Sequence, residues 1–291
     1  QSDGHFPNVI TLTSALKACG GIQDIQKGAE IHDEIVRKRL LDKDCLLGTA
    51  LVDMYAKCGE LGKAQEVFDE LPLQSVASWN ALIGGYVHQG RGEDAIICFE
   101  QMQNHGLTPN VITFSCILKA CSNDEATDRG EQIHDQIMSD GGLIEKHTKV
   151  LGDALVCMYA KCGRLMKAQE VLEKLQVKTI VSWNALITGH AQQGLSEDAL
   201  CYFEEGVPPD AITFSLILNV CSSLRAIDEG ERVHDEIVCR RLKGKHIVLD
   251  NALVDMFAKH GKLGKAQKVF DELPFRDVVS WNSLMTGYAR N

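Results

Sequence analysis

Apolar residues recur along the chain at steps of three and four positions, as in Leu61, Ala64, Val67, Phe68 and Leu71. This spacing places the five side chains on one face of a helix, because a helix turns once in 3.6 residues. Polar and charged residues fill the positions between them. The pattern therefore predicts amphipathic helices and gives no alternation typical of strands.

Glycine and proline divide these helical segments at regular places. Five glycines stand just after a periodic segment, where a left-handed residue ends one helix and turns the chain into the next: Gly59, Gly90, Gly163, Gly194 and Gly261. Four prolines fall near the ends of second helices and oppose their continuation: Pro72, Pro109, Pro209 and Pro274. Each unit is predicted to be a helix, a short turn and a helix, which buries its apolar stripe only by stacking on neighbouring units.

Three phrases recur in a fixed order. VITLTSALKAC at Val9 returns at Val111 and Ala211, MYAKCG at Met54 returns at Met158 and Met256, and SWNALIGGY at Ser78 returns at Ser182 and Ser280. The copies of the first phrase start 102 and then 100 residues apart. Three different hairpins fit in each period, which gives units of about 34 residues and predicts an all-α repeat array.

Composition narrows the classes of function. The 291 residues carry a formal charge of −10 with 45% hydrophobic content and 6 prolines, which excludes a disordered tail, a collagen-like rod and a bulk-basic nucleic-acid binder. The 11 cysteines and the lack of a long apolar run argue against a disulfide framework and a membrane span. Residues 1–7 lack the pattern of a secretory signal and the last residues lie inside a helical pattern, so we expect a segment of a longer protein.

The phrases SWNALI, MYAKCG followed by KAQEVFDELP, and ITFSxxLKAC followed by GxxIHDxI resemble the pentatricopeptide repeat (PPR) family of plant organelles. They resemble in particular the PLS subclass, which alternates P, L and S repeats, and the resemblance covers about residues 9–291. It implies a right-handed superhelical α-solenoid of stacked antiparallel helical hairpins.

The family register makes the Asn of SWN the fifth residue of its unit. The predicted units are then L 9–44, S 45–75, P 76–110, L 111–148, S 149–179, P 180–210, L 211–246, S 247–277 and a partial P 278–291. The second L unit has about two extra residues around 141–146. The second P unit lacks four residues near 204–207, so its second helix is expected to be one turn short.

The resemblance implies that residue five and the last residue of each unit read one RNA base together. The predicted pairs are Thr13 with Asp44, Thr49 with Ser75, Asn80 with Asn110, Ser115 with Thr148, Asp153 with Thr179, Asn184 with Asp210, Ser215 with His246, and Asn251 with Asp277. Short polar side chains suit this task, because Asn donates and accepts, a hydroxyl does either, and Asp accepts only. By the family's code the target is 5′-G-R-Y-N-N-U-N-U-3′, read parallel to the chain.

A plainer interpretation stands beside this one. Ser78, Ser182 and Ser280 are natural helix N-caps, and an Asn two residues later would then lie on a solvated first turn. Recurrence of the phrase in register, with a polar residue closing each unit, favours base reading.

Residue two of each unit is apolar, and in the family such side chains pack between successive bases. The predicted set is Ile10, Leu46, Ala77, Ile112, Val150, Val181, Ile212 and Val248. The alternative is ordinary packing inside the hairpins. The resemblance also implies that residue 13 contacts the RNA backbone. In the S units this residue is Lys57, Lys161 or Lys259, and these lysines are the predicted phosphate contacts. This positive track is sparse, so we expect weak nonspecific binding. The second helices carry Glu66, Asp69, Glu70, Asp271 and Glu272, which predicts an acidic outer face.

Two look-alike sites are discounted. His32-Asp33-Glu34 and His234-Asp235-Glu236 imitate the His-x-Glu of zinc deaminases, but the chain has no Cys-x-x-Cys, and the third copy ends in Gln136. The cysteines of the repeat phrases lie about 100 residues from their equivalents, so they are expected to be buried apolar residues, not metal ligands. Trp79, Trp183 and Trp281 are expected to pack within hairpins. We predict no cofactor and no catalysis by this chain.

We predict an α-solenoid that binds single-stranded RNA, and the family resemblance implies a mitochondrial or chloroplast setting. The P-L-S alternation implies that the parent protein guides C-to-U editing, with editing-factor proteins or a deaminase domain as further partners and no membrane contact. One alternative is a peptide-binding scaffold, because tetratricopeptide arrays share the 34-residue hairpin, although their W-x2-L-G-x2-Y phrase is missing. A hydrolase acting on RNA is a third, and the lack of a carboxylate cluster argues against it.

Overall fold

The structure is a computed structural model that describes residues 7–41, 45–122, 126–139, 141–205 and 208–290. Within these ranges, the side chains of residues 141–148, 202, 204 and 205 are not described. Every regular element of the described part is a helix, and the chain divides into two compact units, residues 1–151 and 152–291.

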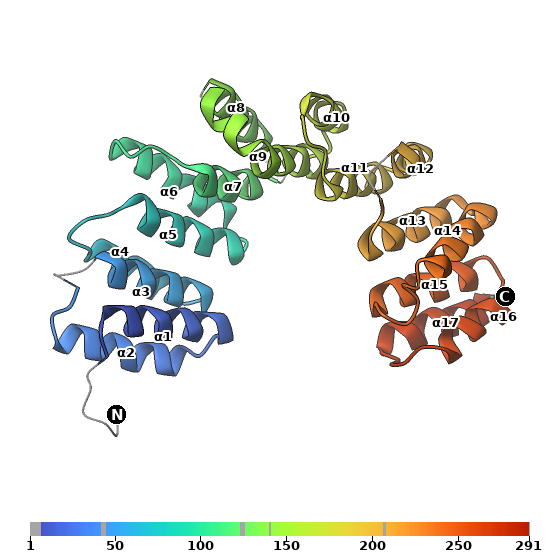
Figure 1. Cartoon of the computed structure of the whole chain (residues 1–291), viewed down its shortest axis with the longest axis horizontal. Coiled ribbons are helices and arrows are strands. Elements are labelled where there is room, and N and C mark those ends of the chain that lie inside the picture. Colours follow the sequence, from blue (N-terminus) through green and yellow to red (C-terminus); the bar gives the residue numbers. More distant parts are fainter. Residues whose placement is uncertain (1–6, 42–44, 123–125, 140, 206–207, 291) are drawn as a thin grey trace. The chain divides into compact units, whose positions relative to one another are not determined.

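The first unit is built of helical hairpins in chain order (Figure 1). Its helices are α1 (Val9–Ile22), α2 (Ile25–Arg37), α3 (Cys45–Lys57), α4 (Leu61–Asp69), α5 (Val76–His88), α6 (Gly92–Asn104), α7 (Val111–Ala120) and α8 (Thr127–Ser139), followed by the start of α9 (Gly141–Lys161). The first helices α1, α3, α5 and α7 pack on one another in sequence, and each packs on the second helix of its own hairpin. The stacking predicted from the sequence is therefore present.

Glycine allows successive first helices to approach closely. A Cβ placed on Gly85 of α5 would lie 2.5 Å from the Cβ of Ala56 of α3 and 3.2 Å from Leu61 Cδ2. Leu51, Leu82 and Ile83 are fully buried beside this contact. Ala56 and Gly85 lie near the C-terminal ends of α3 and α5, so the two first helices pack closely there.

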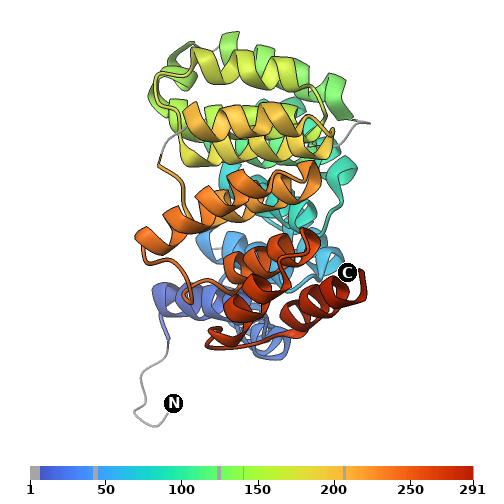
Figure 2. The same ribbon diagram turned by 90° about the vertical axis from the view of Figure 1, so that its right-hand side faces the viewer.

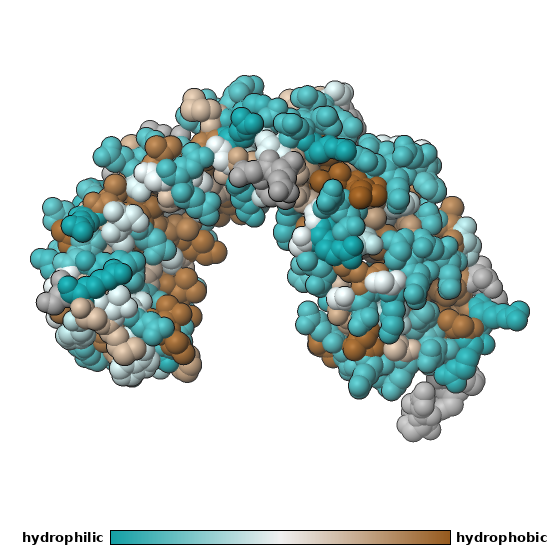
Figure 3. Space-filling view, turned by 180° about the vertical axis from the view of Figure 1, so that it is seen from behind, coloured by the Kyte–Doolittle hydropathy of each residue, from teal (hydrophilic) through white to brown (hydrophobic). Residues whose placement is uncertain are grey.

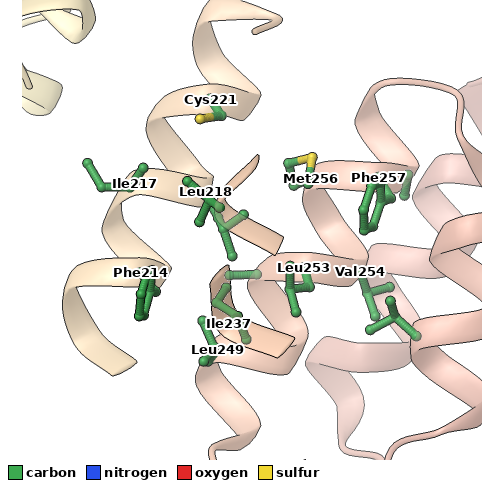
Figure 4. Packing of buried hydrophobic residues seen from close by; sticks show 14 of the residues in the cluster. Phe214, Ile217, Leu218, Cys221, Ile237, Leu249, Leu253, Val254, Met256 and Phe257 are labelled. Carbon is green, nitrogen blue, oxygen red and sulfur yellow. The ribbon is translucent and has the colours of Figure 1, made fainter. Parts of the chain in front are cut away.

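The second unit repeats the arrangement (Figure 2). Its helices are the remainder of α9, α10 (Leu165–Lys174), α11 (Ile180–Gln192), α12 (Ser196–Glu205), α13 (Ala211–Leu224), α14 (Ile227–Cys239), α15 (Ile247–Lys259), α16 (Leu263–Asp271) and α17 (Val278–Arg290). The first helices α11, α13, α15 and α17 pack on one another in order. Figure 4 shows Phe214, Leu218 and Cys221 of α13 in the same core as Leu253 and Phe257 of α15.

The tryptophans pack as expected in two of three hairpins. Trp79 is 3% exposed and meets Phe68 edge to face at 4.5 Å between ring centroids. Trp183 is 8% exposed. Trp281 meets Phe270 in the same way at 4.7 Å but is 50% exposed, because no second helix follows α17 in the described residues.

The turns follow the prediction. The five glycines at the ends of first helices all have positive φ, between 70° and 83°, in the region that side chains with a Cβ rarely adopt. At Gly59, with φ of 83°, the following residue donates its N–H to Tyr55 O and so satisfies a carbonyl at the end of α3.

Two departures from regular repeats appear where the sequence indicated them. Helix α12 has 10 residues against 13 in the equivalent α6, so it is about one turn short. The extra residues around 141–146 are helical and belong to α9, which has 21 residues. This helix begins at Gly141, eight residues before the predicted start of the S unit at residue 149. The other first helices begin where the predicted units begin, at Val9, Cys45, Val76, Val111, Ile180, Ala211, Ile247 and Val278.

The predicted all-α repeat fold is confirmed, and the right-handed superhelix stays a prediction. No helix in the described residues combines the length and the apolar character needed to cross a membrane.

Candidate RNA-binding surface

A groove in the first unit brings together predicted base readers from three successive repeats. Its lining, around a volume of about 430 Å³, includes Thr13, Thr49 and Asn80, the fifth residues of their units. The other lining residues include Leu46, Ala77 and Ile112, the second residues of consecutive units. These six come from α1, α3, α5 and α7, because the same position of each stacked helix recurs on one surface. The groove therefore alternates short polar groups with apolar ones.

The apolar residues at position two are exposed throughout both units. Their exposed fractions are 75% for Ile10, 67% for Leu46, 60% for Ile112, 50% for Val150, 51% for Val181, 63% for Ile212 and 69% for Val248. Ala77 is also exposed. A side chain that packed inside its own hairpin would be buried. These exposed fractions therefore exclude the alternative that residue two serves ordinary packing inside the hairpins.

The closing residue of a unit stands at the N-cap of the next first helix. Ser75, Asn110, Thr179 and Asp210 cap α5, α7, α11 and α13, and each accepts a hydrogen bond from a backbone N–H of the first turn. Asp277 does the same for Ser280 N at 2.8 Å. The first N–H groups of a helix lack partners within it, which explains the short polar residue at this place. His246 occupies the equivalent place of α15 but makes no such bond with its side chain.

Two asparagine readers bond directly to their closing residues. Asn80 Nδ2 donates to Asn110 Oδ1 at 3.1 Å. Asn251 Nδ2 donates to both carboxylate oxygens of Asp277, at 3.1 and 3.3 Å. Since the partners lie 30 and 26 residues apart in the chain, stacking of the hairpins creates each pair.

Two further pairs are joined differently. Thr179 Oγ1 donates to Asp153 Oδ1 at 2.6 Å. Asn184 and Asp210 both accept from the hydroxyl of Thr213, at 2.8 and 3.0 Å. The shortened α12 thus leaves Asp210 beside its predicted partner, so the displacement that a short helix could cause is not seen.

Hydroxyl readers instead bond to their own helix. Thr13, Thr49, Ser115 and Ser215 donate to the backbone carbonyl four residues earlier, at 2.8, 3.0, 2.8 and 2.8 Å. Three of the four belong to L units. Asp44, the predicted partner of Thr13, and the side chain of Thr148, the partner of Ser115, lie outside the described residues.

Accessibility differs among the readers. Asn80, Asp153 and Asn184 are half-buried, which leaves part of each side chain open to a ligand. Ser215 and Asn251 are only 6% and 7% exposed. The last two readers consequently offer less surface to a base than the sequence pattern implied.

The N-cap interpretation of the SWN serines is wrong. Helices α5 and α11 begin at Val76 and Ile180, so Ser78 and Ser182 are their third residues and are fully buried. Ser280 is likewise the third residue of α17 and fully buried. The Asn two residues later therefore does not stand on a solvated first turn.

Asp277 is held as an acceptor. The backbone N–H of Ser280 and then its hydroxyl lower the pKa of this carboxyl below its ordinary value. It is therefore ionised at neutral pH and supplies only acceptor atoms.

The predicted phosphate-contacting lysines are exposed but differ in their partners. Lys57 lies 2.7 Å from Asp53 Oδ2, and Lys259 lies 2.6 Å from Asp255 Oδ2, in each case one helical turn earlier. In the middle S unit that place is Cys157, so Lys161 has no carboxylate one turn before it. Lys161 therefore carries the least compensated of the three charges.

Replacing Lys161 with glutamine is expected to weaken RNA binding more than replacing Lys57, because Asp53 already neutralises part of the Lys57 charge. The logarithmic salt dependence of binding should become shallower by about 0.7 for one lost phosphate contact on a single strand. Titrations at several salt concentrations measure both effects. Lys174→Gln, on the second helix α10, is the control, and an equal effect there would contradict the assignment.

Sequence reasoning did not single out residue nine of the repeats. Lys17 and Asp53 both occupy this position, and both line the groove. Lys17, on α1, is a further candidate for contact with an RNA phosphate, whereas Asp53 forms the ion pair with Lys57. Their periodic spacing with the readers is visible in the sequence and could have revealed them.

The acidic residues of α4 and α16 are exposed, as expected. Figure 3 shows hydrophilic residues over most of the visible face and apolar residues gathered in patches between them.

The residues of the look-alike sites serve other purposes. His32 Nδ1 lies 2.9 Å from the Tyr55 hydroxyl, and burial lowers the pKa of its imidazole. Cys19, Cys121, Cys162 and Cys221 are buried, as expected, whereas Cys58 is only partly buried. Burial raises the pKa of the Cys221 thiol to about 11. The residues that the structure describes contain no group of three or more His, Cys, Asp or Glu suited to a metal ion.

Stacked helical hairpins whose first helices carry a repeated polar and apolar ladder define the chain as a helical-repeat protein. The PPR repeat model matches residues 49–74, 153–180, 181–206, 251–278 and 279–291, and the PPR repeat family model matches residues 74–123. The chain belongs to the pentatricopeptide repeat family.

Similar proteins of Arabidopsis thaliana include a chloroplastic pentatricopeptide repeat-containing protein, 35% identical over 98% of this chain and 46% of its own length. A mitochondrial one is 36% identical over 100% of this chain and 45% of its own length. The chain thus spans less than half of these relatives. Their locations are the two organelles that the resemblance implied.

The crystal structure of the pentatricopeptide repeat protein PPR10 in complex with an 18-nt psaJ RNA element has a similar fold. Its TM-score is 0.76 at 20% identity, over 99% of this chain and 44% of that chain. At this identity the likeness supports the fold alone.

Proposed function

We propose that the chain binds single-stranded RNA in a sequence-specific manner, with one nucleotide per repeat. The observation that carries the proposal is the groove of the first unit, where three successive readers alternate with exposed apolar residues. Bases of single-stranded RNA can be splayed apart, so that their edges meet polar groups and their faces meet apolar ones. The binding of PPR10 to an RNA element supports the proposal by family membership.

The closing residues supply the atoms that distinguish pyrimidines. Asn110 Oδ1 accepts from the N–H groups of Ile112 and Thr113, at 3.0 and 3.1 Å, so the amide nitrogen of Asn110 remains to donate. Asp210 and Asp277 offer acceptors only. Uracil donates from N3, whereas cytosine accepts there. This chemistry agrees with U for Asn paired with Asp, and with a pyrimidine for Asn80 paired with Asn110.

The proposed target is 5′-G-R-Y-N-N-U-N-U-3′. The readers of nucleotides three and six, Asn80 and Asn184, have both a defined partner network and open surface. The buried Asn251 makes the U at nucleotide eight the weaker of the two U assignments.

The P, L and S labels of the predicted units and the editing role belong to the same proposal. In the full-length protein, this array would place a transcript so that a deaminase domain, in the same protein or supplied by an editing-factor partner, converts one cytidine to uridine. This chain's contribution is to position the RNA.

The pair Asn184 and Asp210 provides the test. Asn184→Thr combined with Asp210→Asn is expected to move the preference at nucleotide six from U toward A, by about tenfold if one hydrogen-bonded contact is exchanged. Gel-shift titrations with RNAs that differ only at nucleotide six measure this change, and circular dichroism checks that the helical content is kept.

Matched DNA and a peptide library separate the proposal from a peptide-binding scaffold. Retention of the same U preference by the double variant would show that the register or the code is misapplied to this short unit. Binding to peptides without binding to RNA would reject the proposed function itself.

A further inference from the structure

A buried hydroxyl lies behind each asparagine reader and comes from the next repeat. It belongs to Thr113 behind Asn80, to Thr213 behind Asn184, and to Ser280 behind Asn251. Each is residue three of its unit and the third residue of its helix. Thr113 and Ser280 are fully buried and Thr213 is 4% exposed, so these hydroxyls cannot rely on water for hydrogen bonds.

Each hydroxyl faces two side-chain acceptors, Oδ1 of the reader and Oδ1 of the closing residue, and the reader oxygen is the nearer one. The distances to the reader Oδ1 are 2.6 Å from Thr113, 2.8 Å from Thr213 and 2.7 Å from Ser280. The distances to Oδ1 of the closing residue are 3.1, 3.0 and 2.8 Å, so the single proton of each hydroxyl has its shorter bond to the reader. The same hydroxyls accept from the backbone N–H of the closing residue, at 3.1, 3.3 and 3.1 Å. The hydroxyl thereby connects the reader to the N-cap of the following helix.

The opposite side of the amide is also defined. Asn80 Nδ2 faces Asn110 Oδ1, an oxygen that two backbone N–H groups already hold in place. If the Asn80 amide turned over, its oxygen would face Asn110 Oδ1 with no hydrogen between them and would lose the hydrogen bond that the Thr113 hydroxyl donates. At Asn251 a turned amide would face the ionised carboxylate of Asp277. The amides of Asn80 and Asn251 therefore each have one favourable orientation.

We infer that residue three of the following repeat is a positioning residue for base selection. This inference rests on the proposed function. The hydroxyl of residue three holds the reader's amide oxygen toward the protein interior, and the amide nitrogen is left to contact the base. A base with an acceptor at that place is selected. The reader's preference then depends on a residue outside its own repeat and outside the reading pair.

Helix capping alone does not account for the arrangement. Thr11 is the same residue of the first repeat, where its hydroxyl donates to the N-cap Asn8 Oδ1 at 2.9 Å. Thr11 is exposed, and no reader of an earlier described repeat lies behind it. Burial and the bond to a reader occur together at Thr113, Thr213 and Ser280.

Thr113→Val removes the hydroxyl and keeps the shape of the side chain. It is expected to reduce the preference for a pyrimidine over A at nucleotide three by about three- to tenfold, the effect of one neutral hydrogen bond. Thr113→Ser keeps the hydroxyl and should keep the preference. Thr11→Val is the matched control and should leave the preference at nucleotide three unchanged. Binding of RNAs varied at nucleotides three and six measures these effects.

Thr213→Val provides an independent second site. It should reduce the U preference at nucleotide six and leave nucleotide three unchanged, while Thr113→Val should do the reverse. A general loss of stability would not confine the effect of each variant to one nucleotide. If one variant folds poorly, the other still tests the inference.

The outcomes separate the two proposals. A wild-type protein without preference at nucleotides three and six would reject the proposed function, and the inference with it. Wild-type preference that persists in both valine variants would overturn the inference alone. An equal loss of affinity for every RNA would also overturn it, since it would show that the hydroxyl only caps the helix.

A measurement without RNA tests the same contact. In the free protein, the side-chain amide protons of Asn80 should exchange with water faster in Thr113→Val than in wild type or Thr113→Ser, because the amide loses its fixed orientation. Unchanged exchange of the assigned Asn80 amide would contradict the inference.

Discussion

Replacing Leu46 and Ile112 together with serine is expected to weaken RNA binding by at least about tenfold, since full burial of one Leu or Ile side chain contributes about 1.5–3 kcal/mol. Both side chains line the groove of the first unit and are 67% and 60% exposed. Little buried core is lost with them, so the melting temperature should stay nearly unchanged. Fluorescence anisotropy with an RNA of the proposed sequence, together with thermal unfolding, measures the two quantities.

Met166→Ser is the matched control for this double variant. Met166 is apolar and 80% exposed, but it lies on the second helix α10. Its replacement should leave RNA affinity within about twofold of wild type. If the double variant bound RNA as tightly as wild type, the exposed apolar residues of the groove would not contact bases.

Gly85→Ala is expected to destabilise the first unit by about 2 kcal/mol, because overpacking a well-filled contact usually costs about 1–3 kcal/mol. The added Cβ would lie 2.5 Å from Ala56 Cβ and 3.4 Å from Ala56 Cα. Since neither is the movable end of a long side chain, α3 and α5 must separate. RNA affinity should fall as well, since α3 and α5 also carry Thr49 and Asn80, which line the groove. Urea unfolding followed by circular dichroism measures the loss.

Gly62→Ala makes the same chemical change without the close contact. Nothing lies within 4 Å of a Cβ at this position of α4, so the alanine should stabilise the helix by about 0.5–1 kcal/mol. The two variants should therefore shift the unfolding midpoint in opposite directions. A shift of the same sign and size in both would mean that helix propensity, and not the contact with Ala56, determines the effect at Gly85.

Most of the fold is predictable because the same sequence signals for helices and turns recur in successive repeats. Helical spacing, glycine after the first helix and a polar residue before the next one occur together in nearly every unit, so an ambiguous copy is resolved by its neighbours. The exception is α9, where residues 141–148 continue the next helix instead of forming a connection. The sequence showed about two extra residues there, but helix propensity disfavours Gly141 and Gly142 and does not reveal that the helix starts at them.

The candidate surface was predictable in outline and not in its connections. Position in the repeat is enough to place Asn80 and Ile112 on one surface. It does not reveal that Lys57 is paired with Asp53, although their spacing of four residues permits it. The role of Ser280 was missed for a physical reason, since a serine near a helix start resembles an N-cap until the helix boundary is known.

Residue three is leucine in every S unit, as Leu47, Leu151 and Leu249, and all three are fully buried. For the reader before each of them, in a predicted L unit, residue three of the following repeat therefore supplies a hydrocarbon side chain and no hydroxyl. On the proposed register this leaves every third nucleotide of a bound transcript less constrained than the two that follow it. Natural targets should therefore share pairs of adjacent specified nucleotides separated by one variable nucleotide. A search for target transcripts should allow any base at the variable positions.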